Sequence, residues 1–263
     1  MSHDFLIRFL PAIHADGPTQ MGMDLALLDH AESEPTAIWL RVYTWSAPTL
    51  SLGYFQAWNE LPEMLRSAWA GQAMVRRPTG GGAIWHDGDL TYAVVVPAAH
   101  PWAGHSRTLY QAIHNALASL LQQGGAAVAR RSEVQPSHRP GLTPGVKSSP
   151  FLCFDDGDAD DLLLKGHKIV GGAQRRRGWA TLQHGSVHWQ RSALPQAAHL
   201  PGLVDMAPAF HEPSAIKWGL SLGPRLGALW QMPVEPTAFP PEVMLTAHGW
   251  SNRLRQPEWL LKR

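Results

Sequence analysis

Apolar residues recur at helical spacing in several stretches of the chain. Met21, Leu25 and Leu28 are three to four residues apart and predict one face of a helix. A longer apolar stripe follows Ser106, a candidate N-cap, and stops at Gly124, which is typical of a helix end. The predicted helices cover residues 20–31, 61–69 and 107–123.

Runs of β-branched, aromatic and leucine residues alternate with these helices and predict strands. Two of the runs flank Asp87-Gly88, a dipeptide typical of the tight turn in a β-hairpin. A later region is typical of strands interrupted at Lys165-Gly166, Gly171-Gly172 and Gly178. The predicted strands cover residues 37–45, 50–54, 83–86 and 90–96, followed by the interrupted region 162–189. The hairpins favour a largely antiparallel sheet.

Residues 132–150 contain four prolines among Ser, Arg and Gly, so no regular element fits and a long loop is predicted. Such a loop inside a compact domain is typically functional or mobile, and we expect a mobile gate here. No linker divides the chain. We therefore predict the α/β (α+β) fold class, with one domain over residues 1–263 and a single mixed, largely antiparallel sheet flanked by helices.

Composition narrows the class of protein. Hydrophobic residues make up 44% of the 263 residues and charged residues 16%, which excludes a disordered chain. Lys and Arg number 22 against 21 for Asp and Glu, so no general charge favours nucleic acid or a membrane as partner. No signal peptide or membrane-spanning run is recognisable, and the one cysteine suits a reducing compartment. We expect a cytoplasmic protein.

Three consecutive glycines follow two arginines in Arg76-Arg77-Pro78-Thr79-Gly80-Gly81-Gly82. Without Cβ atoms, backbone N–H groups can approach a ligand closely, and the arginines can bind a carboxylate or phosphate. The spacing matches neither a Walker loop, which needs Gly-Lys-Ser/Thr, nor a dinucleotide-binding fingerprint, which precedes a helix. A ligand-binding loop and an ordinary glycine-rich turn both stay open.

Cys153 and Lys168 are candidates for acyl-transfer chemistry. A thiolate is a strong nucleophile that a neighbouring cation or base can activate. The alternative for Cys153 is a buried, inert thiol. Lys168 stands between glycine and an apolar pair, where an ammonium could stabilise a developing oxyanion. The alternative for Lys168 is a solvated lysine on an edge strand.

Histidines and a run of arginines complete the candidates. His86 and His184 could each act as acid, base or hydrogen-bond partner of a substrate, but with 14 histidines in the chain a structural role stays open. His184 and His188 are four apart, which in a strand is not a zinc-binding face, so no metal site is predicted. The run Arg175-Arg176-Arg177 indicates either a solvated turn or a docking patch for an acidic protein.

Taken together, several segments resemble the biotin/lipoate A/B protein ligase superfamily. The strongest runs from Arg76 through the three glycines to Tyr92, and it includes Ile84-Trp85-His86-Asp87-Gly88. The resemblance resumes at Gly166-His167-Lys168-Ile169-Val170-Gly171-Gly172-Ala173 and closes with Leu182-Gln183-His184-Gly185-Ser186. Residues 250–262 resemble the family's short C-terminal helix. The resemblance implies the ligase-like catalytic domain with a short C-terminal helical tail.

The cysteine indicates a branch of this superfamily. Cys153 stands fifteen residues before Lys168, which resembles the cysteine-dependent octanoyltransferases, where that cysteine carries the acyl group as a thioester. The resemblance implies that Cys153 is the nucleophile and that Lys168 stabilises the oxyanion. His86 is the first candidate for orienting substrate or moving a proton. The implied substrate-binding residues are Arg76, Arg77, Thr79, Gly80, Gly81, Gly82, His86, Gly171, Ala173 and His184.

The implied reaction moves an octanoyl or lipoyl group to a lysine of a lipoyl-domain protein. The donor would be acyl carrier protein or an acylated lipoyl domain, and the acceptor a glycine cleavage H protein or an E2 subunit of a 2-oxoacid dehydrogenase. No cofactor is implied. Two alternatives stay open. An ATP-dependent lipoate-protein ligase would use ATP and Mg and would not need the cysteine, whereas a non-catalytic lipoyl-domain-binding protein would form no adduct.

Overall fold

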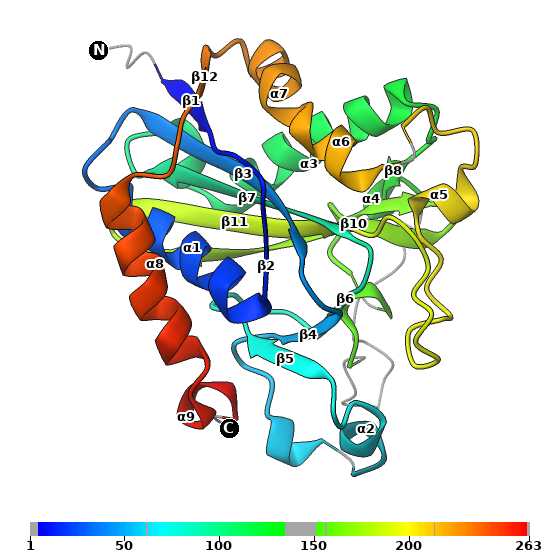
Figure 1. The fold of residues 1–263 in the computed structure, drawn as a ribbon. Coiled ribbons are helices and arrows are strands. Elements are labelled where there is room, and N and C mark those ends of the chain that lie inside the picture. The colour runs from blue at the N-terminus through cyan, green and yellow to red at the C-terminus, as the bar shows by residue number, and fades with distance from the viewer. Residues whose placement is uncertain (1–4, 62, 135–150, 156, 213, 262–263) are drawn as a thin grey trace.

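The computed structural model describes residues 5–61, 63–134, 151–155, 157–212 and 214–261. Its centre is a mixed sheet in the order β12-β1-β3-β7-β11-β10-β9-β8, with β2 paired to β3 (Figure 1). The strands are β1 (Leu6–Phe9), β2 (Ile13–Ala15), β3 (Ala37–Trp45), β7 (Leu90–Pro97), β8 (Ala129–Arg130), β9 (Leu162–Leu164), β10 (His167–Arg176), β11 (Ala180–Val187) and β12 (Val234–Pro236). Pairing is parallel among β12, β1, β2 and β3 and antiparallel from β3 to β8. The predicted large, mostly antiparallel sheet flanked by helices is confirmed.

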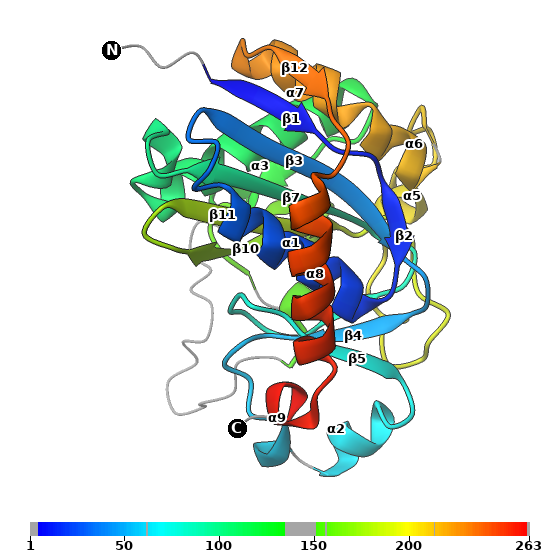
Figure 2. The ribbon, with the colours of Figure 1, turned by 60° about the vertical axis from the view of Figure 1, so that its left-hand side comes forward.

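Side chains of β3 alternate between two apolar cores, as the period of two in a strand requires. Ile38 and Leu40 face the core under α3, α6 and α7, whereas Trp39 and Tyr43 face the core under α1 and α8. These helices are α1 (Gly17–His30), α3 (Ser106–Gln123), α6 (Ala215–Leu220), α7 (Leu222–Trp230) and α8 (Pro241–Leu254). The two helical layers therefore cover opposite faces of the sheet (Figures 1 and 2).

A second sheet, which the sequence does not predict, holds β4 (Thr49–Leu52), β5 (Ala73–Arg76) and β6 (Ile84–His86) in the order β5-β4-β6. The predicted hairpin across Asp87-Gly88 is wrong, because β6 pairs with β4 while β7 pairs with β3 and β11. The turn at Asp87-Gly88 instead connects β6 of the small sheet to β7 of the large sheet. Packing explains this, since Leu50, Trp69 and Trp85 share a small separate core that holds β6 against β4.

Several boundaries differ from those predicted. α1 begins before residue 20 because the carboxylate of Asp16 accepts the N–H of Thr19 at 3.1 Å and caps the helix. His105, and not Ser106, is the N-cap of α3. β10 continues through Gly171-Gly172, where the sequence predicts a break. The turn at Lys165-Gly166 is confirmed. Shorter helices are α2 (Glu63–Ala68), α4 (Arg131–Val134), α5 (Leu203–Met206) and α9 (Pro257–Leu260), with 3-10 helices η1 (Trp58–Glu60), η2 (Pro101–Ala103) and η3 (Cys153–Asp155).

The chain after β11 returns to both sheets. β12 extends the large sheet beside β1, α8 packs on α1, and α9 lies against β5 (Figure 2). The segment 250–262, expected to be one helix, contains the end of α8 and α9. Of the predicted loop 132–150, residues 132–134 belong to α4, and 135–150, with the expected gate, lie outside the described residues. Within the described ranges, no helix is long and apolar enough to cross a membrane.

Candidate active site

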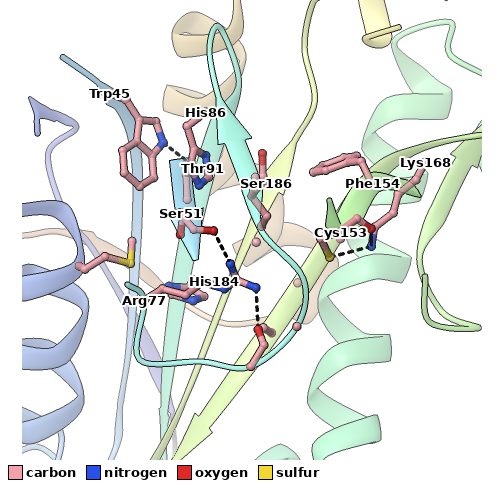
Figure 3. Close-up of a pocket in the computed structure, with 18 residues that line it drawn as sticks. Trp45, Ser51, Arg77, His86, Thr91, Cys153, Phe154, Lys168, His184 and Ser186 are labelled. Atoms are coloured by element: carbon pink, nitrogen blue, oxygen red, sulfur yellow. Dashed lines mark hydrogen bonds between the residues drawn. The ribbon is translucent and has the colours of Figure 1, made fainter. Parts of the chain in front are cut away.

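A cavity lies between the large sheet and the glycine loop, which is the segment 78–83 between β5 and β6 (Figure 3). The space between its walls, including the open mouth, is about 470 Å³. Of the residues that the sequence singles out, it is lined by Arg77, Gly80, Gly81, His86, Cys153, Lys168, Gly171, Ala173 and His184. Arg76, Thr79 and Gly82 lie outside the lining, contrary to expectation.

Cys153 begins η3 and is half-buried beside the cavity. Its N–H donates to the carbonyl of Ala83 at 2.7 Å, and the N–H of Ala83 donates to the carbonyl of Phe151 at 2.8 Å. These two bonds tie the cysteine to the end of the glycine loop. Gly82 allows the approach, because a Cβ there would lie 3.0 Å from the backbone nitrogen of Cys153. Cys153 is therefore not the fully buried thiol of the structural alternative.

Lys168 reaches the same point from β10. Its Nζ lies 3.4 Å from Sγ of Cys153 and 2.8 Å from Oδ2 of Asp161 (Figure 3). The residue is 6% exposed, so the alternative of a solvated edge lysine is wrong. Gly171 makes room, since a Cβ there would lie 2.4 Å from Cε of Lys168. Burial lowers the pKa of Lys168, but the charges of Cys153 and Asp161 raise the pKa by more. An ammonium therefore faces the sulfur at neutral pH.

The two arginines before the glycine loop bind the protein's own backbone. The buried guanidinium of Arg77 donates to the carbonyls of Gly80 and Gly82, each at 2.7 Å. Burial lowers the pKa of Arg77 to about 10, so its charge persists at neutral pH. Arg76 donates to carbonyls of residues 53–56 at 2.7 to 3.3 Å. Arg77 therefore shapes the glycine loop, whereas Arg76 holds the segment after β4, and contact of either arginine with the carboxylate or phosphate of a ligand stays a prediction.

His184 links the glycine loop to the core. Its Nδ1 lies 2.8 Å from a carboxylate oxygen of Asp24 in α1, and its Nε2 lies 2.6 Å from the hydroxyl of Thr79. Asp24 is fully buried and also accepts hydrogen bonds from Arg41 at 2.8 Å and from the hydroxyl of Tyr43 at 2.9 Å. Thr79, though outside the lining, is thus anchored through His184 to the sheet and to α1.

His86 lies with Trp45 on one side of the cavity, whereas Cys153 and Lys168 lie on the other side in this view (Figure 3). The rings of His86 and Trp45 are stacked, with centroids 3.8 Å apart and an angle of 17° between planes. Nδ1 of His86 lies 2.8 Å from Oδ2 of Asp89. Burial raises the pKa of Asp89, but the charge and hydrogen bond of His86 lower it by more.

The arginine run 175–177 is bound in part to the protein itself. Arg175 donates to the carbonyl of Pro78 at 3.1 Å, and its guanidinium lies 5.2 Å from the ring centre of Tyr54. Nε of Arg177 lies 3.9 Å from a carboxylate oxygen of Asp29. A solvated turn therefore does not describe all three arginines, and the docking patch for an acidic protein stays a prediction. Among the described residues, no three His, Cys, Asp or Glu side chains are placed to hold a metal ion.

Sequence reasoning did not select three residues that shape this site. Asp161 holds Lys168, Tyr110 holds Asp161 at 2.6 Å, and Trp45 closes the cavity beside His86. Asp161 ends the acidic run 155–161, which carried no pattern of its own in the sequence. Trp45 is the last residue of a correctly predicted strand. Because the chain contains 12 Trp residues, the sequence does not distinguish Trp45 from those that only pack in the core.

Known proteins resemble this chain in sequence and in fold. A family model described as the lipoyl protein ligase A/B catalytic domain matches residues 16–199. The chain belongs to this family. The octanoyltransferase LipM of Moorella thermoacetica is 38% identical over 182 residues, which are 68% of this chain and 64% of that protein. LipM of Geobacillus kaustophilus is 34% identical over 188 residues, with the same two shares, 68% and 64%. The match thus spans just under two thirds of these relatives.

Solved structures of the family share the fold. A bipartite lipoate protein ligase from Thermoplasma acidophilum superposes with a TM-score of 0.73 and 18% identity, covering 98% of both chains. A lipoate-protein ligase A bound with ATP gives a TM-score of 0.70 and 18% identity, again over 98% of both chains. The family resemblance that the motifs carry is confirmed.

Proposed function

We propose that this protein is an acyltransferase that moves an octanoyl or lipoyl group to a lysine of a lipoyl-domain protein through a thioester on Cys153. The observation that carries the proposal is the contact of 3.4 Å between Sγ of Cys153 and Nζ of Lys168 at the edge of the cavity. A thiolate beside a buried ammonium is a nucleophile suited to thioester exchange. The names of the LipM relatives support octanoyl as the acyl group.

In the first half-reaction, Sγ of Cys153 attacks the carbonyl carbon of the donor thioester. The new C–S bond forms, the donor's C–S bond breaks, and the carrier leaves as a thiolate. Nζ of Lys168 is the positive group nearest to the reacting centre among the described hydrogen-bond partners of Cys153, and it stabilises the oxyanion. The acyl chain then lies in the cavity, toward Trp45 and His86.

In the second half-reaction, the amine of an acceptor lysine attacks the same carbonyl. A C–N bond forms, the C–S bond to Cys153 breaks, and the amine proton passes to solvent. Exchange between a thioester and an amine needs no external energy source, so ATP, Mg and other cofactors take no part in the proposal. The donors we propose are acyl carrier protein or an acylated lipoyl domain, and the acceptors glycine cleavage H protein or E2 subunits, in the cytoplasm.

In this proposal His86 orients the substrate and does not carry a proton for Cys153. It lies across the cavity from the sulfur and stacks on Trp45, so it contacts the far end of a bound acyl chain. Arg77, His184 and Thr79 hold the glycine loop in shape. The glycines at 80 and 81 and the alanine at 173 leave space for the acyl chain, whereas Gly171 leaves space for Lys168.

The test is the mass of the pure protein after incubation with octanoyl acyl carrier protein, without ATP or Mg. We expect an octanoyl-sized adduct that hydroxylamine releases and that maps to Cys153. Cys153→Ser should fold normally and form no such adduct. Full turnover by Cys153→Ser, or lipoate-dependent ATP consumption without any adduct, would overturn the proposal in favour of a ligase. Binding of a lipoyl domain with neither reaction would indicate a binding protein.

A further inference from the structure

A buried carboxylate lies directly behind Lys168. Asp161 has no exposed surface, and its Oδ2 lies 2.8 Å from Nζ of Lys168 and accepts the N–H of Asp158 at 2.7 Å. Oδ1 of Asp161 accepts the hydroxyl of Tyr110 at 2.6 Å, and that hydroxyl accepts the N–H of Gly172 at 3.0 Å. Helix α3, strand β10 and the loop before β9 therefore all fix this carboxylate.

Burial favours the neutral forms of three further ionisable side chains near Lys168, whereas the guanidinium of Arg131 lies near Asp161, since a Cβ at Gly157 would lie 2.4 Å from Nη2 of Arg131 and 2.5 Å from Oδ2 of Asp161. Burial raises the pKa of Tyr110 of α3 well above its usual value and also raises that of Tyr92 of β7. Burial lowers the pKa of His114 of α3. Asp161 is thus the carboxylate that forms an ion pair with Lys168 within the described residues.

The neighbouring carboxylate has different partners. Asp160 is 2% exposed, and its side chain binds Arg107 at 3.2 Å and lies 3.9 Å from Arg130. It has no contact with Lys168 among the described ion pairs. Both adjacent aspartates are buried and bound to other side chains, but among the described ion pairs Asp161 alone contacts the lysine beside the sulfur.

We infer that Asp161 is the positioning residue that keeps Lys168 protonated and aimed at the sulfur of Cys153, so that Lys168 serves as a fixed positive charge and not as a base. This inference rests on the proposed function. Lys168 keeps its three protons through both half-reactions. The thiol of Cys153 loses its proton to solvent before attack, the thiolate forms again when the C–S bond to Cys153 breaks, and the proton of the acceptor amine also goes to solvent.

The experiment compares Asp161→Asn with Asp160→Asn as the matched control. The rate of octanoyl adduct formation on Cys153 is measured by intact mass from about pH 6 to about pH 10, and folding is checked by thermal denaturation. In Asp161→Asn, Lys168 stays buried but loses its partner, so its pKa falls. We expect the alkaline loss of rate to begin at least about one pH unit lower, with about a tenfold lower rate at neutral pH. Asp160→Asn should keep the wild-type pH profile.

A double-mutant cycle separates positioning from general structural support. If Asp161 acts through Lys168, then Asp161→Asn adds no further loss in the Lys168→Met background. Tyr110→Phe keeps the carboxylate but removes one hydrogen bond to it, and should shift the profile in the same direction by less. That variant carries the test if Asp161→Asn does not fold.

Two results would overturn the inference while leaving the proposed function intact. One is a wild-type pH profile in a folded Asp161→Asn protein that still forms the adduct. The other is an equal loss in Asp160→Asn and Asp161→Asn with additive losses in the Lys168→Met background. Absence of any adduct in the wild-type protein would instead remove the proposed function itself.

Discussion

If the cavity holds the acyl chain as proposed, we expect Trp45 to limit the length of that chain, and Trp45→Ala tests this. A row of paired residues crosses the large sheet. It contains Gly171 of β10, Ser186 of β11, Thr91 of β7 and Tyr43 of β3. Neighbouring strands are about 4.8 Å apart, so this row is about 14 Å long. It starts at Lys168, whose Nζ would lie 2.8 Å from a Cβ at Gly171.

We expect an octanoyl chain to extend along this row up to Trp45. Seven C–C bonds advance about 1.3 Å each when extended, from a bond length of about 1.5 Å, which gives about 9 Å. The indole of Trp45 reaches back from β3 over β7, where its Nε1 donates to the hydroxyl of Thr91 at 2.9 Å. The chain therefore ends against the stacked rings of Trp45 and His86, and these two residues also line a neighbouring cavity beyond them.

Removing the indole should admit a longer chain. Dodecanoyl has four more methylenes, and burying each contributes about 0.8 kcal/mol. The ratio of dodecanoyl to octanoyl transfer should therefore rise by up to about 3 kcal/mol, or about 200-fold, in Trp45→Ala. Competition between the two thioesters of one carrier, with the Cys153 adducts separated by mass, measures the ratio. Ile216→Ala, which enlarges the neighbouring cavity alone, is the control. An unchanged ratio in a folded Trp45→Ala protein refutes the reasoning.

Three further predictions follow from single contacts. Gly171→Ala should lower the rate of adduct formation on Cys153 at least about tenfold, because its Cβ would displace Lys168, whereas Gly178→Ala, with open space around it, should not. Burial lowers the pKa of His100 to about 4, so the stability it contributes is complete above about pH 6.5 and is lost as pH falls toward 4; urea unfolding should show a smaller loss over that range in His100→Gln. Trp259→Phe removes the hydrogen bond of 3.0 Å from Nε1 to the carbonyl of Arg76 and should lower the free energy of unfolding by about 1 kcal/mol in the same assay.

Local periodicity predicts most of this fold because both faces of the central strands are buried by helices. Spacing alone predicts the strand 37–45 and the existence of the helix over 107–123 correctly, although the N-cap of this helix is His105. The hairpin at Asp87-Gly88 fails for a tertiary reason. A turn dipeptide predicts where the chain reverses, but the strand that β6 joins depends on the small core around Trp69 and Trp85, which no local pattern reveals.

A glycine pair can mark either a turn or a close approach within a continuous strand, and the sequence alone does not distinguish the two. At Gly171-Gly172 the missing side chains mark a close approach within a continuous strand, since a Cβ at Gly172 would lie 3.1 Å from the hydroxyl of Tyr92. At Lys165-Gly166 both residues have positive φ, 50° and 84°, and the chain turns. The composition of the two pairs differs little, so only the surrounding packing distinguishes a break from a space reserved for a side chain.

The sequence predicts part of the position of Asp161, but not the bulge that completes it. Once the turn at Lys165-Gly166 is accepted, it fixes the register of the hairpin, and Leu164 then faces His167 while Leu163 faces Lys168. The bulge after Lys168 brings Leu162 opposite Val170, so the next residue back, Asp161, comes beside Gly171. A carboxylate opposite a glycine leaves a space that the lysine of the same strand can fill. The register of β9 and β10 therefore determines which residue of the acidic run 155–161 pairs with the lysine beside Cys153, and residue type alone does not.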